Sequence, residues 1–287
     1  MMEITEKSTV ALFRGAAFLS AGVVVMIFGF LLVFGLPLFG EGRMIAIVAA
    51  MWEPGGGSYG ILPMLAGTAS IASLGVILSI PLSLGAAALI SVFAPRGWSR
   101  FFRSVFLMAT GIPTVIYGFV GIFLLAPFVR EFFETGSGLC VLSASLMLAV
   151  LITPTMTLFF VHGFDRTPRS WLSAVDALGG NDVQKLLYVV LPGAWRHIAG
   201  GIALAAGRAQ GDTLLALMLS GNAAQIPGGP LESARTLTAH IALVFAADHE
   251  SPEFLSIFAC GLALYLFSTL TVIVLRRLEA PARRQSR

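Results

Sequence analysis

An all-α integral membrane protein with six transmembrane helices is the fold class that three features of the sequence predict. Of 287 residues, 57% are hydrophobic and only 11% charged, which leaves too little polar material to cover a water-soluble globule. The apolar residues fall into blocks that reach or exceed the roughly 20 residues a helix needs to cross a bilayer. The basic residues gather in alternate connections between these blocks. The bilayer is therefore the expected solvent.

The six expected spans are long stretches with few or no charged residues. They cover residues 15–40, 54–95, 104–129, 135–164, 197–222 and 254–275. Arg208 and Asp212 interrupt the fifth block. The apolar part of the second, residues 61–93, would form a helix of roughly 50 Å, so we expect it to tilt or project, with a kink at Pro81. Two shorter spans in its place would invert the basic loops that follow.

The distribution of Lys and Arg predicts the orientation. Fourteen of them lie in the N-terminal segment, the second connection, the loop 163–196 and the C-terminal tail, whereas the opposite side holds only Arg43, Arg130 and Arg235. The positive-inside rule then places both termini in the cytoplasm. We expect a cytoplasmic lead over 1–13, a transmembrane domain over 14–279, and a basic tail over 280–287 that contacts anionic membrane lipid.

The loop 163–196 has the local chemistry of two short helices. Thr167 can cap the first, with Pro168 at its first position. Gly179 and Gly180 end that helix, and Asn181 can cap the next. An ordinary surface hairpin between two spans would also fit these signals.

The spacing within this loop resembles the EAA loop of ABC-importer permeases. That pattern is Glu-Ala-Ala, three residues, Gly, nine residues, then an aliphatic residue, any residue, and Leu-Pro. The matching positions here are Ser173, Ala174, Val175, Gly179, Val189, Leu191 and Pro192. Ser173 stands where the family has Glu, and Asp176, one turn on, is a candidate substitute. The resemblance implies a coupling helix that docks on an ATPase.

Three further stretches resemble phosphate ABC transporter permease subunits of the PstC type. Residues 111–119 read GIPTVIYGF, similar to the family's GIPSVVYGF. Residues 207–213 read GRAQGDT, similar to GRAIGET, with Asp212 in place of Glu. Residues 235–243 read RTLTAHIAL, similar to RTLTANIAL, with His240 in place of Asn.

Arg208 is the strongest candidate for a functional residue. An arginine near the bilayer centre costs roughly 3 kcal/mol, so it must face a partner or a wet cavity. Asp212 lies four residues on, which is the same face of a continuous helix. The pair either joins helices or lines a translocation path, where the guanidinium suits phosphate oxygens and the carboxylate weakens its grip. Thr213 and Thr236 are weaker candidates for hydroxyl contacts.

The resemblance implies the type I ABC-importer permease fold in a bacterial inner membrane. The implied partners are a homologous second permease, a dimer of ABC ATPases and a periplasmic phosphate-binding protein. The sequence contains no nucleotide-binding motif of the form GxxxxGK[ST], so ATP hydrolysis is expected from a partner chain. No cofactor, metal or nucleic acid is expected. The acidic cluster near Asp248 and His249 lacks a ligand spacing that would define a metal site.

Three alternatives remain at this point. The chain could carry another oxyanion, such as sulfate, molybdate or phosphonate. It could be a membrane-bound enzyme acting on phosphorylated substrates, although the spans offer no nucleophile or metal constellation. It could also be a non-transporting sensor or scaffold, an option that Ser173 keeps open.

Overall fold

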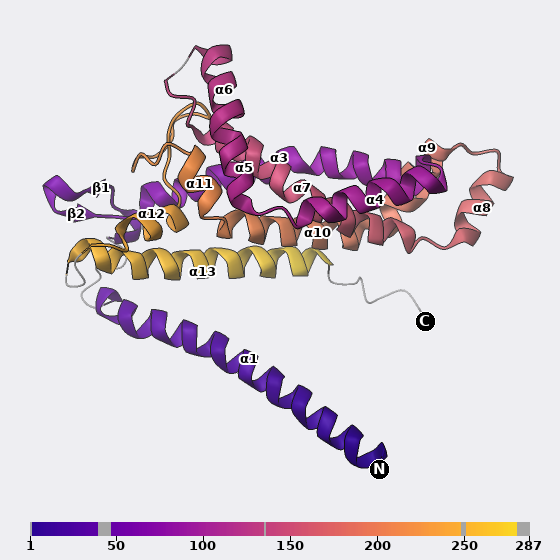
Figure 1. The fold of residues 1–287 in the computed structure, drawn as a ribbon, viewed down its shortest axis with the longest axis horizontal. Coiled ribbons are helices and arrows are strands. Elements are labelled where there is room, and N and C mark those ends of the chain that lie inside the picture. Colours follow the sequence, from indigo (N-terminus) through magenta and orange to yellow (C-terminus); the bar gives the residue numbers. More distant parts are fainter. Residues whose placement is uncertain (1, 40–46, 135, 248–250, 280–287) are drawn as a thin grey trace.

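The computed structural model describes residues 2–39, 47–134, 136–247 and 251–279, most of which are helical (Figure 1). In this described part, six helical segments are long and apolar enough to cross a membrane, which confirms the expected number. They are Thr9–Gly35, Leu62–Phe93, Thr114–Phe133, Val141–Asp165, Asp182–Gly211 and Glu253–Val274. The expected tail, 280–287, and the acidic cluster at 248–250 lie outside the described residues.

Helix α7 (Val141–Asp165) forms the centre of the bundle. Helices α3 (Leu62–Ala88) and α10 (Leu191–Gly211) pack against it along its length, and α13 (Pro252–Glu279) packs on α10 (Figure 1). Gly75 permits the close approach of α3, because a Cβ there would lie 3.1 Å from the Leu148 side chain. The α7 side chains are accordingly mostly buried.

Helix α1 (Met2–Phe39) diverges from the bundle (Figure 1). Its C-terminal half packs on α13, with ring centroids 4.7 Å apart for Phe28 and Tyr265 and 5.3 Å apart for Phe34 and Phe258. The described side chains of its N-terminal half are exposed. Because α1 begins at Met2, the expected lead and the first span form one helix, and their division stays a prediction.

A small antiparallel hairpin lies at one end of the bundle. Strands β1 (Trp52–Glu53) and β2 (Ser58–Tyr59) pair around a 3-10 turn, Pro54–Gly56. The Trp52 ring meets Tyr59 and His240 edge-on, with centroids 5.6 and 4.5 Å apart. The hairpin thus packs on α12 (Leu237–Val244), which lies at the same end.

The third span begins after a helix break and covers Thr114–Phe133, which shifts the bounds from the expected 104–129. Helix α4 (Arg96–Thr110) ends before Pro113, whose extended backbone starts a new helix. Helix α5 (Thr114–Val120), a π-helical turn (Gly121–Leu125) and α6 (Ala126–Phe133) follow and project from the bundle (Figure 1). Proline lacks the N–H that would continue α4.

The fifth span also differs from its expected bounds. It begins with α9 (Asp182–Lys185), continues through a π-helical turn (Leu186–Val190) and ends with α10 at Gly211. Pro192 lies inside this helical run, at the second position of α10. The expected continuation to residue 222 is wrong, because the backbone turns at Asp212 and only the short α11 (Leu214–Leu219) follows.

Candidate functional site

Helix α10 ends at Gly211, and two short helices, α11 and α12, are bonded to the residue that follows. Asp212 is extended, with φ −75° and ψ 117°, in a Gly-Asp-Thr sequence of poor helix formers. Its Oδ1 accepts a hydrogen bond of 2.8 Å from the Leu215 N–H at the start of α11. Its carbonyl oxygen accepts one of 3.1 Å from Thr238 Oγ1 on α12. Asp212 therefore ties α11 and α12 to the end of the fifth span.

Arg208 lies on the last turn of α10 and is half-buried. Its Nη1 donates a hydrogen bond of 3.0 Å to Thr155 Oγ1 on α7. The expected shared helix face with Asp212 is wrong, because α10 ends at Gly211, although the Arg208 charge still acts on the Asp212 carboxylate. No ion pair between them forms in the described structure, and the Asp212 carboxylate bonds to the backbone instead.

Thr155 is a partner that the sequence reasoning missed. The available signal was a hydroxyl following Pro154 within an apolar span, but 53 positions separate Thr155 from Arg208. Gln210 was missed as well: it is buried and bonds to Thr271 and Ser268 on α13, over 3.0 and 3.2 Å. The end of α10 therefore carries polar links to both of its helical neighbours.

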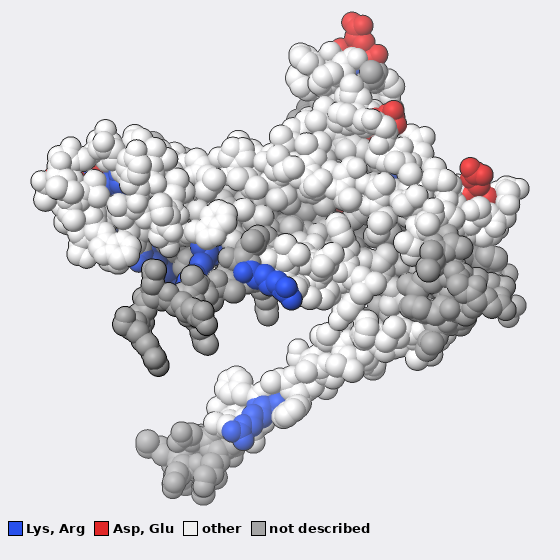
Figure 2. Space-filling model, turned by 180° about the vertical axis from the view of Figure 1, so that it is seen from behind, with Lys and Arg blue, Asp and Glu red and all other residues white. Residues whose placement is uncertain are grey.

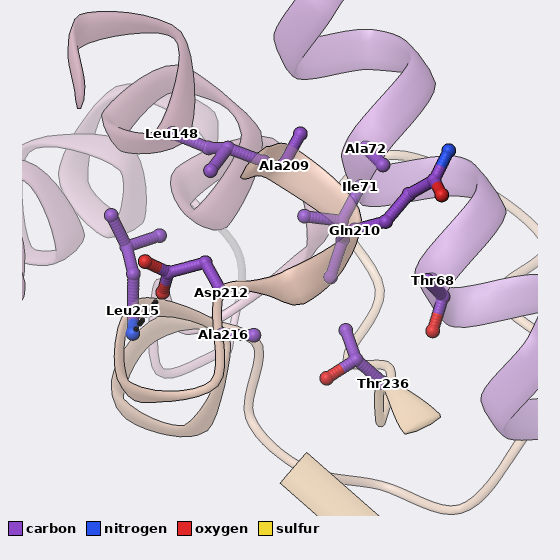
Figure 3. A pocket seen from close by; sticks show the side chains of 10 residues that line it. All are labelled: Thr68, Ile71, Ala72, Leu148, Ala209, Gln210, Asp212, Leu215, Ala216 and Thr236. Carbon is purple, nitrogen blue, oxygen red and sulfur yellow. Dashed lines mark hydrogen bonds between the residues drawn. The ribbon is translucent and has the colours of Figure 1, made fainter. Parts of the chain in front are cut away.

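A small cavity lies beside this break (Figure 3). Ten residues line it: Thr68, Ile71, Ala72, Leu148, Ala209, Gln210, Asp212, Leu215, Ala216 and Thr236. Its volume of about 10 Å³ holds at most about one water molecule. Figure 3 shows the Asp212 carboxylate directed at the Leu215 N–H and away from Gln210. In this conformation the cavity beside Asp212 is too small to admit an oxyanion.

The two threonine candidates have different surroundings. Thr236 Oγ1 accepts the Ala239 N–H over 3.1 Å and thereby caps α12, and it also lies 3.1 Å from Thr238 Oγ1. Thr213 precedes α11, is half-buried and makes no cap bond with its side chain. The structure thus brings Asp212 and Thr236 to one cavity but gives the Thr236 hydroxyl a structural role.

Residues 212–244, here called the α11–α12 cap, are bonded to the bundle at several points. The Leu237 N–H donates to Thr68 Oγ1 over 2.9 Å, and Ser233 Oγ donates to the Leu139 carbonyl over 3.0 Å. Within the cap, Arg235 Nε donates to the Asn222 carbonyl over 2.9 Å. Gly118 and Gly121 give α11 room against α5, because a Cβ at either would overlap a side chain of α11.

Residues 166–185, the α8–α9 hairpin, occupy the opposite end of the bundle (Figure 1). The hairpin is shorter than the expected loop 163–196, because α7 reaches Asp165 and α9 starts at Asp182. Gly179, with φ 76°, follows α8 (Arg169–Ala177). The Asn181 cap is confirmed as a capping box with Gln184, whereas the Thr167 cap is wrong, since Pro168 takes the cap position without a side-chain bond.

The motif residues do not form one cluster. Ser173 and Ala174 are exposed on α8, while Leu191 and Pro192 belong to the first turn of α10. Asp176 Oδ1 pairs with Lys185 Nζ over 2.7 Å, so the candidate substitute for the missing Glu is engaged within the chain. Trp171 and Leu178 are 55% and 88% exposed, which leaves two large apolar side chains on the hairpin surface.

Charge is also distributed unevenly over the surface. On the face in Figure 2, the acidic groups lie mainly toward the projecting α6 and the end that carries the β-hairpin. The basic groups lie mainly toward the opposite half and on α1. The pattern agrees with the charge asymmetry of the sequence.

Six apolar spans, a polar helix break inside the bundle and an exposed helical hairpin define a multi-pass membrane protein of the transport class. The family model described as "Binding-protein-dependent transport system inner membrane component" matches residues 79–284, and the chain belongs to that family. It is therefore a permease subunit of an ABC importer, a transport component and not an enzyme.

Named relatives agree with this assignment. The chain is 29% identical over 279 residues to the probable ABC transporter permease protein YqgH of Bacillus subtilis, covering 93% of this chain and 90% of that protein. It is 27% identical over 249 residues to the phosphate transport system permease protein PstC of Mesorhizobium japonicum, covering 80% and 76%. A probable PstC of Methanocaldococcus jannaschii is 24% identical over 274 residues, covering 87% and 86%.

Solved structures support the fold. An inward-facing structure of the MetNI methionine ABC transporter superposes with a TM-score of 0.62 at 14% identity, covering 84% of this chain and 98% of that one. An amino acid ABC transporter crystallised with histidines gives 0.51 at 14% identity, covering 74% and 89%. The expected type I ABC-importer permease fold is thus confirmed.

Proposed function

We propose that this chain is the transmembrane subunit of an ATP-driven importer of inorganic phosphate and forms half of the translocation path beside a homologous second permease. The observation that carries this proposal is Arg208, a half-buried arginine at a helix break inside the bundle. Its one bond described in the structure is from Nη1 to Thr155. A guanidinium has five N–H donors, so most of them are available to an oxyanion.

The energetics favour a functional arginine. Thr155 is a neutral partner and does not cancel the charge, which costs roughly 3 kcal/mol inside a bilayer. The Asp212 carboxylate is near in sequence but bonds to the Leu215 N–H. A cation without a direct counter-ion attracts an anion, and the nearby carboxylate keeps that attraction weak enough for release. We propose that the ion takes the place of Thr155 when the path opens, with Thr213 as a further hydroxyl contact.

The α8–α9 hairpin is the proposed docking site for a dimer of ABC ATPases. Its exposed Trp171 and Leu178 are apolar anchors of the kind that interfaces bury. The helical run from Asp182 to Gly211 joins the hairpin to Arg208 without a break, over 30 residues or about 45 Å. A movement of the hairpin on ATP binding would therefore reach the ion site through one rigid element, and Ser173, Ala174, Asp176, Gly179, Leu191 and Pro192 all lie along this route.

The proposed orientation in the membrane determines where the remaining partners bind. The hairpin faces the cytoplasm of a bacterial cell, and the α11–α12 cap faces the periplasm, where a phosphate-binding protein would deliver the ion. The relatives named as PstC support phosphate as the cargo. Another oxyanion, such as sulfate, molybdate or phosphonate, is the second candidate, because a guanidinium binds all of them.

Uptake measurements separate these candidates. The chain is co-expressed with its partner subunits, and uptake of labelled phosphate is measured alone and with excess sulfate, molybdate or methylphosphonate. Phosphate uptake that resists all three competitors is the expected result. Transport of a competitor instead of phosphate would overturn the substrate and leave the permease standing. An assembled complex that transports none of them would favour the sensor alternative.

A further inference from the structure

A groove between α4 and α7 lies apart from the Arg208 site. It has a volume of about 270 Å³. The side chains that define it are Arg100, Arg103 and Leu107 on α4, and Leu158, Val161 and Asp165 on α7. Their spacing of three to four residues places each set on one face of its helix.

The groove is polar at one end and apolar at the other. Arg103 donates two hydrogen bonds to the Asp165 carboxylate, over 2.7 and 3.0 Å, and Asp165 is the last residue of α7. Leu107 and Leu158 line the groove four and seven residues from Arg103 and Asp165 along their helices, so the groove continues from the ion pair to apolar side chains. A molecule in the groove would meet charge at the end that carries the α8–α9 hairpin and hydrocarbon further in.

The polar end has an excess of positive charge. Asp165 is paired with Arg103, whereas the exposed Arg100 guanidinium has no bonded partner within the described residues. Arg166 follows Asp165 and lies 3.3 Å from His197 Nε2, and His162 is exposed at the groove wall. The single carboxylate does not neutralise these arginines.

We propose that this groove binds an anionic phospholipid, with the lipid phosphate at Arg100 and an acyl chain along Leu107, Leu158 and Val161. Basic pockets between transmembrane helices select anionic headgroups through charge. An inorganic phosphate ion would occupy only the polar end and leave the apolar half unfilled, so the shape favours the amphiphile.

The surface of α4 supports a position at the membrane boundary. None of its residues is buried, and it exposes Trp98 and Phe101 beside the exposed Arg96 and Arg100. Aromatic and basic side chains on one helix are typical of an element that lies at the lipid headgroups. The lipid would there brace α4 against α7, whichever ion the permease carries.

Binding of labelled phosphatidylglycerol to the full chain in phosphatidylcholine nanodiscs tests this proposal. Arg100→Gln is expected to weaken phosphatidylglycerol binding about fivefold, the effect of one basic residue at a membrane surface. Arg100→Lys retains the charge and should bind like the wild type. Arg130→Gln, which removes an exposed arginine from α6 at a distant site, is the matched control and should change nothing.

Three results would overturn the lipid site. The first is equal retention of phosphatidylglycerol and phosphatidylcholine by the wild type. The second is no loss of phosphatidylglycerol binding in Arg100→Gln, and the third is displacement of the labelled lipid by millimolar inorganic phosphate at constant ionic strength, which would make the polar end a site for the free ion. A Leu107→Trp variant gives a second route: filling the apolar end should weaken lipid binding while leaving Arg100 in place.

Discussion

The α11–α12 cap and the α8–α9 hairpin are both short-helix insertions at the ends of long spans, yet they differ in how they are held. The cap is bonded to α3 and α13 through the side chains of Thr68 and His240 and to the start of α7 through its backbone, and the first half of α12 is buried. The hairpin has no buried residue in α8 or α9. Most of the side-chain bonds that the structure describes for the hairpin stay within it. The exception is at its start, where Arg166 Nη1 lies 3.3 Å from His197 Nε2 on α10.

The cap is therefore packed and bonded mainly by residues of its own chain, whereas the hairpin leaves large apolar side chains exposed. In the cap, buried polar groups have partners, so the position of the cap is fixed relative to the helix break at Asp212. In the hairpin, Trp171 and Leu178 remain exposed, and the proposed contact with an ATPase would bury them. Changes in the cap should therefore act on folding, and changes in the hairpin on assembly.

The largest expected difference comes from a matched pair of glycines with positive φ. In Gly221→Ala, φ is +78° and the new Cβ would lie 2.7 Å from the Leu139 carbonyl oxygen and closer still to Ser233. We expect a loss of about 3 kcal/mol, from the left-handed backbone and from overpacking. In Gly179→Ala, φ is +76° but nothing lies within 4 Å, so about 1 kcal/mol is expected.

Thermal unfolding of both variants in detergent measures this difference. The wild type and a Gly55→Ala variant, at a glycine with open space and no positive φ, serve as references. Equal losses at Gly221 and Gly179 would contradict the view that the cap is tightly packed and the hairpin is not.

Lowering the pH should reduce the stability of the protein through the cap and not through the hairpin. His240 bonds to Ser256 Oγ over 3.0 Å and faces Arg235 and Trp52; burial, and then the Arg235 charge, lower its pKa from 6.5 to about 4. The folded state binds the proton less well than the unfolded state, so stability is full above pH 6.5 and falls as the pH drops toward 4. The loss should approach, at most, about 3 kcal/mol.

Unfolding midpoints between pH 7.5 and 4 test this expectation. The wild type should lose stability across the window from 6.5 to 4, and His240→Asn should show a shallower dependence from a lower starting value. A slope that His240→Asn leaves unchanged would assign the acid sensitivity to other groups.

Leu178 should matter for assembly and not for folding. Its side chain is 88% exposed, so Leu178→Ser should leave the unfolding midpoint of the isolated chain unchanged. Removing an apolar anchor typically costs 1 kcal/mol or more, so affinity for the ATPase subunits should fall about tenfold. Leu178→Met, which keeps an apolar side chain, should bind normally. Wild-type affinity in Leu178→Ser would refute the proposed anchor.

The smallest effect is expected at the Asp176–Lys185 pair. The Asp176 side chain is 58% exposed and the Lys185 side chain 17%, and Lys185 also pairs with Asp182 over 2.9 Å. Ion pairs at a protein surface contribute little, so Lys185→Met should change unfolding only slightly and weaken ATPase binding about twofold. Asp176→Asn should also weaken ATPase binding about twofold, and the double variant should bind the ATPase no more weakly than either single variant. A much larger loss in Asp176→Asn alone would show that Asp176 contacts the ATPase directly, in the place of the missing Glu.

The number of spans could be read from the sequence because length and apolarity set it. The helix breaks could not be predicted in this way. Arg208 and Asp212 are four residues apart in the sequence whether or not the helix continues between them. The Gly-Asp-Thr run was a weak local signal, and the bonds from Asp212 to Leu215 and Thr238 decide the geometry. Likewise, a proline such as Pro113 is compatible with a helix break, but the sequence does not determine the direction in which α5 continues.

The site was predicted in part. The structure places Arg208, Asp212 and Thr236 around the same break, but their bonding partners are different from those expected. Thr155 is distant in sequence and lies in an apolar helix, so its contact with Arg208 depends on how α7 packs against α10. In the hairpin, the spacing of the motif placed Gly179 at the end of α8, while the role of Ser173 stays a prediction.

Phosphate uptake by Arg208 variants tests the central claim most directly. Wild type, Arg208→Gln and Arg208→Lys are compared at matched membrane abundance, with co-purification of the ATPase as the check on assembly. We predict that Arg208→Gln lowers phosphate uptake at least about tenfold while assembly stays intact. The reason is that removing one partner of a buried charge pair costs about 2 kcal/mol or more. Arg208→Lys should retain part of the activity. Undiminished uptake in Arg208→Gln would show that Arg208 only joins α10 to α7, and would contradict its place on the ion path.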